Sequence, residues 1–139
     1  LPGAGNILVF DNGSQSGYGG SKGYPKHTRV WSRVLEFDPI TLIKVWEYGV
    51  SSSDDPSYYF SYMISSAQRL PNGNTLITDG VAGHIFEVTS AKKKVWSYQS
   101  PFQDKMGMPL VYRAYRVPPE WLPAAVDNVY ESWAEAYGE

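Results

Sequence analysis

Short apolar runs separated by turn residues recur along the chain, and they predict β-strands. The clearest run, residues 75–79, follows the turn Pro71-Asn72-Gly73 and is rich in residues that suit a pleated, half-buried surface. Asn-Gly adopts positive φ at low cost, which favours a tight turn. In the second half of the chain the predicted strands are residues 63–70, 74–79, 84–89 and 94–99. Because short turns join them, we expect one antiparallel meander in that order.

The first half of the chain repeats this pattern. The matched segments are residues 1–13 with 70–80, 33–38 with 84–89, and 45–48 with 95–98. Near the C-terminal end, Ala114-Tyr115-Arg116-Val117-Pro118 matches Ala67-Gln68-Arg69-Leu70-Pro71. Segments that recur in the same order indicate an internal repeat. The apolar run at residues 6–11 is nearly continuous, so we expect this strand to be buried on both faces.

The repeat predicts an all-β fold, namely a fragment of a β-propeller. Units of four strands and about 40 to 50 residues are typical of propeller blades. The first unit holds the last three strands of a blade, the second unit is complete, and residues 110–118 begin a third. We expect Ala114 to Val117 to be an edge strand or to pair with another chain, since nothing after Pro123 resembles a further strand.

The remaining blades are therefore expected on another chain or in sequence that precedes Leu1, which already lies inside a repeat unit. We place the partial propeller in residues 1–123 and a separate C-terminal segment in residues 124–139. In that segment apolar residues recur at helical spacing, which predicts a short amphipathic helix. The helix either packs on the propeller or docks a partner.

Composition and charge exclude several classes of function. The 139 residues suit one ordinary domain, and a net charge of −2 without a basic cluster argues against nucleic-acid binding. No apolar run approaches the roughly twenty residues that span a bilayer. The chain has no cysteine, and its two histidines, His27 and His84, form no metal-ligand set. No cofactor motif is present.

The sequence resembles the arylsulfotransferase (aryl-sulfate sulfotransferase-like) family, in particular its C-terminal part. The segments that carry the resemblance are residues 5–13 (GNILVFDNG), 32–39 (SRVLEFDP), 66–77 (SAQRLPNGNTLI), 85–89 (IFEVT), 112–118 (YRAYRVP) and 121–123 (WLP). The resemblance implies a propeller, which is six-bladed in the characterised bacterial enzymes. It also implies sulfuryl transfer between phenols by a histidine nucleophile without a nucleotide donor, and a periplasmic or extracellular location.

The family often has a histidine two residues before the alanine of a blade's first strand. This chain has Ser65 and Tyr112 at those positions, so we expect the nucleophile to lie outside it and assign no catalytic residue within it. The alternative is a catalytically silent propeller that serves as a binding or assembly module.

Four residues are candidates for binding a phenolic or aryl sulfate ligand, namely Arg113, Tyr112, Ser65 and His27. The guanidinium of Arg113 matches the acceptor oxygens of a sulfate, although an arginine that bridges adjacent blades is the alternative. His27 lies in a long loop, residues 12–30, where a solvated histidine is the alternative. Arg69 and Arg116 occupy equivalent repeat positions, which favours a structural role for both.

Overall fold

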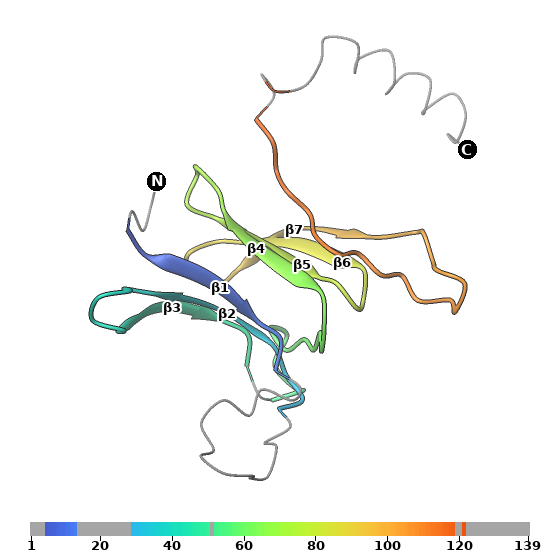
Figure 1. Ribbon diagram of the computed structural model, residues 1–139, viewed down its shortest axis with the longest axis horizontal. Helices are drawn as coiled ribbons and strands as arrows, with labels where there is room; N and C mark the ends of the chain where they lie inside the picture. Colours follow the sequence, from blue (N-terminus) through green and yellow to red (C-terminus); the bar gives the residue numbers. More distant parts are fainter. Residues whose placement is uncertain (1–4, 14–28, 51, 119–120, 122–139) are drawn as a thin grey trace.

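The regular structure is almost entirely β in the computed structural model, which describes residues 5–13, 29–50, 52–118 and 121. Its strands form two antiparallel sheets that face one another (Figure 1). The three-stranded sheet has the order β1 (Ile7–Asp11), β2 (Arg33–Phe37) and β3 (Lys44–Tyr48). The four-stranded sheet has the order β4 (Ser65–Arg69), β5 (Thr75–Asp79), β6 (His84–Val88) and β7 (Lys94–Gln99). The all-β class and the four-stranded meander are confirmed.

The two sheets repeat each other position by position. Glu36 lies opposite Trp46 in the first sheet, and Glu87 lies opposite Trp96 in the second. The pairing then shifts by one residue at the same place in both sheets, so that Val45 and Val95 each form a β-bulge. The internal repeat is therefore present in the three-dimensional structure as well as in the sequence.

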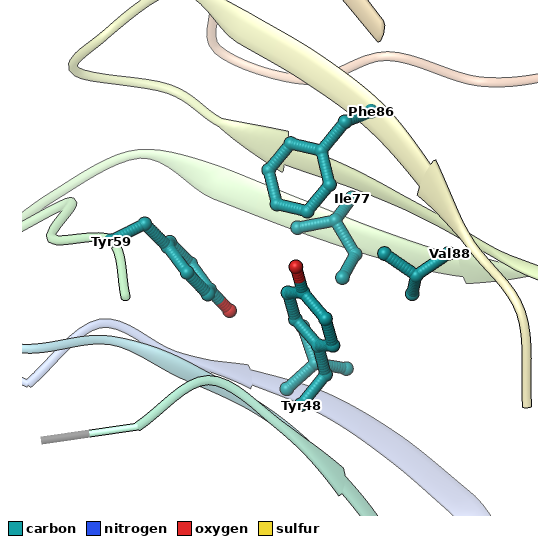
Figure 2. Packing of buried hydrophobic residues seen from close by; sticks show 6 residues of the cluster. Tyr48, Tyr59, Ile77, Phe86 and Val88 are labelled. Atoms are coloured by element: carbon teal, nitrogen blue, oxygen red, sulfur yellow. The ribbon is translucent and has the colours of Figure 1, made fainter. Parts of the chain in front are cut away.

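The hydrophobic core lies between the two sheets. Its buried members come from both sheets and from the loop that connects them: Val34, Tyr48, Tyr59, Ile77, Phe86 and Val88. The rings of Tyr48 and Tyr59 lie 5.9 and 5.8 Å from the ring of Phe86, in tilted and edge-on arrangements that suit aromatic packing. Figure 2 shows these side chains filling the space between the sheets.

The first strand is buried on one face only, so the prediction of burial on both faces is wrong. Leu8 and Phe10 pack against the core. Successive side chains of a strand point to opposite faces, and Ile7 and Val9 are 44% and 38% exposed on the other face. A continuous apolar run shows that both faces of a strand can be buried. It does not show whether another sheet packs against each face.

Residues 110–118 form no strand, and the expected edge strand at Ala114 to Val117 is absent from the structure. The segment lies on the face of the four-stranded sheet that points away from the core, here called the outer face. The main chain of Arg116 exchanges two hydrogen bonds with the side chain of Gln68 on β4, at 2.8 and 3.1 Å. The amide of Ala114 donates to the Thr78 hydroxyl on β5 at 3.2 Å. Pairing with another chain remains a prediction.

Other expectations fall on parts of the chain that the structure does not describe. The C-terminal helix predicted over residues 124–139 lies outside the described residues, as does His27. In the described portion, no helix is both long enough and apolar enough to span a membrane.

Tyr59 is the one buried side chain, within the described residues, whose polar atom has no hydrogen-bond partner. Burial raises the pKa of this phenol well above its usual value, so the hydroxyl stays protonated. An unsatisfied buried polar group costs about 1–3 kcal/mol. We therefore expect Tyr59→Phe to raise the free energy of unfolding by about 1 kcal/mol, measured by urea denaturation.

The matched control is Tyr58→Phe. The Tyr58 hydroxyl donates to the carbonyl of Val30 at 2.7 Å, so its removal is expected to lower the free energy of unfolding by about 0.5–1.5 kcal/mol. A clear loss of stability in Tyr59→Phe would show that its hydroxyl has a partner in solution.

Candidate functional site

Arg69 joins the second sheet to the first. Its guanidinium forms an ion pair with Glu36 on β2 and lies 4.7 Å from the ring centroid of Trp46 on β3. Both charged side chains are largely buried, and Asn6 donates a further hydrogen bond to Glu36 at 2.9 Å. We call this set of arginine, glutamate and tryptophan the arginine anchor.

The same anchor occurs a second time, one repeat later. Arg116 binds Glu87 on β6 at 3.1 Å and lies 5.4 Å from the ring centroid of Trp96 on β7. Asn74 donates to Glu87 at 2.6 Å, as Asn6 does to Glu36. Residues 110–118 therefore sit on the second sheet as β4 sits on the first. This geometry gives Arg69 and Arg116 the same structural role.

Arg113 differs from these arginines. Its Nη1 donates to the Tyr115 hydroxyl at 2.6 Å, and its guanidinium lies 5.9 and 5.6 Å from the ring centroids of Tyr112 and Tyr115. Both tyrosines are strongly exposed. In the described part of the chain each other arginine forms an ion pair, whereas no described carboxylate pairs with Arg113. A guanidinium near two exposed aromatic rings is suited to an anionic aromatic ligand.

Ser65 lies in a hydrogen-bond network instead of projecting into open space. Its Oγ donates to Ser61 Oγ at 2.9 Å and accepts from Asn12 Nδ2 and from the Gly80 amide, both at 3.3 Å. Ser61 and Ser32 are fully buried, and the Ser61 amide donates to Ser32 Oγ at 2.9 Å. The network ties the start of β4 to the loops that follow β1 and β5.

Gly80 connects this network to the Arg113 region. Its amide reaches Ser65, and its carbonyl accepts a hydrogen bond from the amide of Val111 at 2.9 Å. A Cβ atom at Gly80 would collide with the carbonyl oxygens of Ile64 and Val111, so only glycine allows the three backbones to approach so closely. Ser65 and Tyr112, which share one repeat position, thus belong to adjoining segments.

A charged cluster at the end of the first sheet was not identified from the sequence. Asp11 forms ion pairs with Arg29 and Arg33, Arg33 also binds Glu47 at 3.1 Å, and both arginines lie over the ring of Trp31. Partial burial favours a higher pKa for Asp11, but the hydrogen bonds from the two arginines outweigh it and lower the pKa. The only sequence signal was the match of Asp11 with Asp79. The cluster is internally paired, which favours a structural role.

His84 forms no ion pair with a described carboxylate, although Asp79 lies opposite it in the pairing of β5 with β6. Its ring lies 5.0 Å from that of Phe86, and burial together with the charge of Lys94 lowers its pKa. Nucleophilic catalysis by histidine requires a group that orients the ring, and no described side chain forms a hydrogen bond with the His84 ring. Elsewhere in the described stretches, no three His, Cys, Asp or Glu side chains lie close enough together to hold a metal ion.

Comparisons of the chain with protein-family models, curated proteins and solved structures found no match.

Proposed function

We propose that this chain forms consecutive blades of an arylsulfotransferase-like β-propeller and that Arg113 binds the sulfuryl group of an aryl sulfate. The stacking of two equivalent sheets through a repeated arginine anchor supports the propeller. Blades pack face to face around an axis, and each anchor joins the first strand of one unit to the sheet of the unit before it.

The observation that carries the ligand is the environment of Arg113. Its guanidinium has no described carboxylate partner and lies near two exposed tyrosine rings. A sulfate presents several acceptor oxygens to the guanidinium, and an aromatic group can stack on Tyr112 or Tyr115. One site would thus recognise both halves of an aryl sulfate.

In this proposal the chain supplies binding and charge stabilisation, and the nucleophile comes from elsewhere. A histidine nitrogen attacks the sulfur, the S–O bond to the phenol breaks, and the phenolate leaves. An acceptor phenol then takes the sulfuryl group from the histidine. Arg113 would stabilise the negative charge on the sulfuryl oxygens during both steps. Because Ser65 and Tyr112 occupy the two histidine positions, we assign no nucleophile in this chain.

The test is a titration of the chain with 4-nitrophenyl sulfate, in which NMR signals of the tyrosine side chains measure the affinity. We expect Arg113→Ala to weaken binding about 10- to 100-fold, because a hydrogen bond to a charged group is worth about 1.5–3 kcal/mol. Arg113→Lys keeps the charge but loses the two-pronged geometry, and it should bind with intermediate affinity. We expect no release of nitrophenol by the chain alone.

Lys93→Ala is the control, since it removes another exposed cation and leaves the tyrosine pair intact. Equal binding by wild type and Arg113→Ala would exclude Arg113 from the site. Equal affinity for 4-nitrophenol and its sulfate would show that the tyrosine rings alone hold the ligand.

A catalytically silent assembly module is the second candidate. It is favoured by the use of Ser65 in a structural network and by the absence of an ion pair between His84 and a described carboxylate. A chain that binds no aryl sulfate yet assembles with further blades would support this function over the first.

A further inference from the structure

β1 forms one edge of the first sheet, whereas the equivalent strand of the second sheet, β5, has a described neighbour on each side. β1 corresponds to β5, and β5 pairs with β4 on one side and with β6 on the other. β1 pairs with β2, and the described part of the chain supplies no strand on its other side. An unpaired edge offers a row of amide and carbonyl groups to another strand. The residues along this edge are apolar, from Ile7 to Phe10.

The same chain also carries a segment that matches the first strand of a unit in sequence but belongs to no described sheet. Residues 110–118 match β4 in sequence and in their arginine anchor, yet they pair with no described strand. Hydrogen bonds to Gln68, Thr78 and Gly80 already hold this segment on the outer face of the four-stranded sheet. These bonds use the Val111 and Ala114 amides and the main chain of Arg116, and no described strand pairs with the segment.

We propose that residues 110–118 of one copy pair with β1 of a second copy and complete its three-stranded sheet. The register follows from the pairing of β4 with β5, in which Ala67 lies opposite Ile77 and Arg69 opposite Thr75. The equivalent pairing places Ala114 opposite Val9 and Arg116 opposite Ile7. This inference deepens the propeller part of the proposed function and rests on that part. Residues 110–118 also carry Arg113, Tyr112 and Tyr115, so the two proposals share a segment but have separate readouts, mass here and ligand binding there.

The faces that would meet are already complementary. In the contact between copies, the first sheet of one copy would lie on the outer face of the four-stranded sheet of the other. The face of the first sheet in this contact is the one that points away from the core. Ile7 and Val9 are exposed on this face of the first sheet, and Trp96 and Tyr98 on the outer face. Within one copy the equivalent faces form the hydrophobic core. The contact between copies would thus repeat an interface that the fold already uses.

A second copy is the occupant that the chain itself specifies, because each copy carries both the β1 edge and residues 110–118, the segment that matches β4. Such a contact joins different surfaces of the two copies. Head-to-tail contacts of this kind close into a ring or continue as an open series, according to the rotation between copies. Residues 110–118 are already held on the outer face of the four-stranded sheet by hydrogen bonds, so the entropy cost of pairing is reduced.

The experiment is sedimentation of the 139-residue chain from micromolar to near-millimolar concentration. We expect a mass of two or more copies. Val9→Lys places a charge at the proposed contact and should weaken association roughly tenfold or more. Arg116→Glu removes the arginine anchor that holds residues 110–118 on the outer face, and it should also weaken association roughly tenfold or more. Circular dichroism of each variant would check that its sheets are still formed.

The two variants also test the direction of the contact. A Val9→Lys copy can still donate its strand, and an Arg116→Glu copy can still accept one, so an equal mixture should form dimers although neither variant associates strongly alone. Lys93→Glu is the control and should associate like the wild type. A wild-type chain that stays monomeric throughout, or unchanged association in Val9→Lys, would overturn the proposal.

A monomer whose β1 amides become protected from hydrogen exchange only when another protein's strand is added would equally reject the second copy as the occupant. Because the readout is mass and not ligand binding, failure here is distinguishable from failure of the aryl sulfate site.

Discussion

Replacement of Arg69 by alanine is expected to lower the free energy of unfolding by about 3–5 kcal/mol, because removing one partner of a buried ion pair leaves the other charge buried and uncompensated. The side chain of Arg69 is 13% exposed and that of Glu36 is 9% exposed. The substitution also removes the guanidinium from the face of Trp46. Urea denaturation followed by circular dichroism would measure the loss.

The repeat supplies a matched control for this substitution. Arg116 makes the same contacts one unit later, but its side chain is 52% exposed. Glu87 is as little exposed as Glu36, but Asn72 and Asn74 donate hydrogen bonds to it and its arginine is half in water, so we expect Arg116→Ala to cost less than Arg69→Ala. Equal losses in the two variants would show that burial does not distinguish the anchors. A double variant with Glu36→Gln and Arg69→Met lacks both charges, and its free energy of unfolding should lie between those of Arg69→Ala and the wild type.

Replacement of Phe86 by alanine is expected to cost about 3–5 kcal/mol, the range for removing a large aromatic side chain from a core. Phe86 is almost fully buried, and its ring contacts Tyr48 of the first sheet and Tyr59 of the connecting loop. Its loss leaves a cavity where the two sheets meet. Thermal melts should therefore show both sheets unfolding together at a lower temperature.

Phe102→Ala removes an aromatic ring of the same size from an exposed position and should change stability by less than about 0.5 kcal/mol. If Phe86→Ala were as mild as this control, the sheets would not depend on a shared core. Separate melting of the two sheets would likewise contradict a single cooperative unit.

The four-stranded meander was predictable because its determinants are local. Alternating side chains and short turns specify adjacent antiparallel strands without knowledge of the rest of the chain. The start of β4 was not predicted accurately. Residues 63 and 64 were expected in the strand, but Ile64 has a φ of +37°, which lies outside the β region. The burial of β1 on both faces was also wrong, since local pattern does not reveal which faces have a neighbour.

The candidate site was predictable only where the repeat aligns residues. Alignment singled out Tyr112 and Ser65, and it separated Arg113 from the anchor arginines. The clusters around Asp11 and Ser61 depend on partners that lie far apart in the sequence. Arg29 is 18 residues from Asp11, and Asn12 is 49 residues from Ser61. Such contacts arise from the packing of the sheets, so no local pattern announces them.

The two β-bulges have a consequence for solubility. β3 and β7 form the outer edges of the two sheets, and each combines its bulge with an adjacent lysine, Lys44 or Lys94. Bulges and lysines on an edge discourage the uncontrolled addition of strands that leads to aggregation. The β1 edge has neither protection. The edges formed by β3 and β7 are thus protected against uncontrolled strand addition, whereas the β1 edge lacks these two features within the described residues and is the edge that we propose another strand occupies.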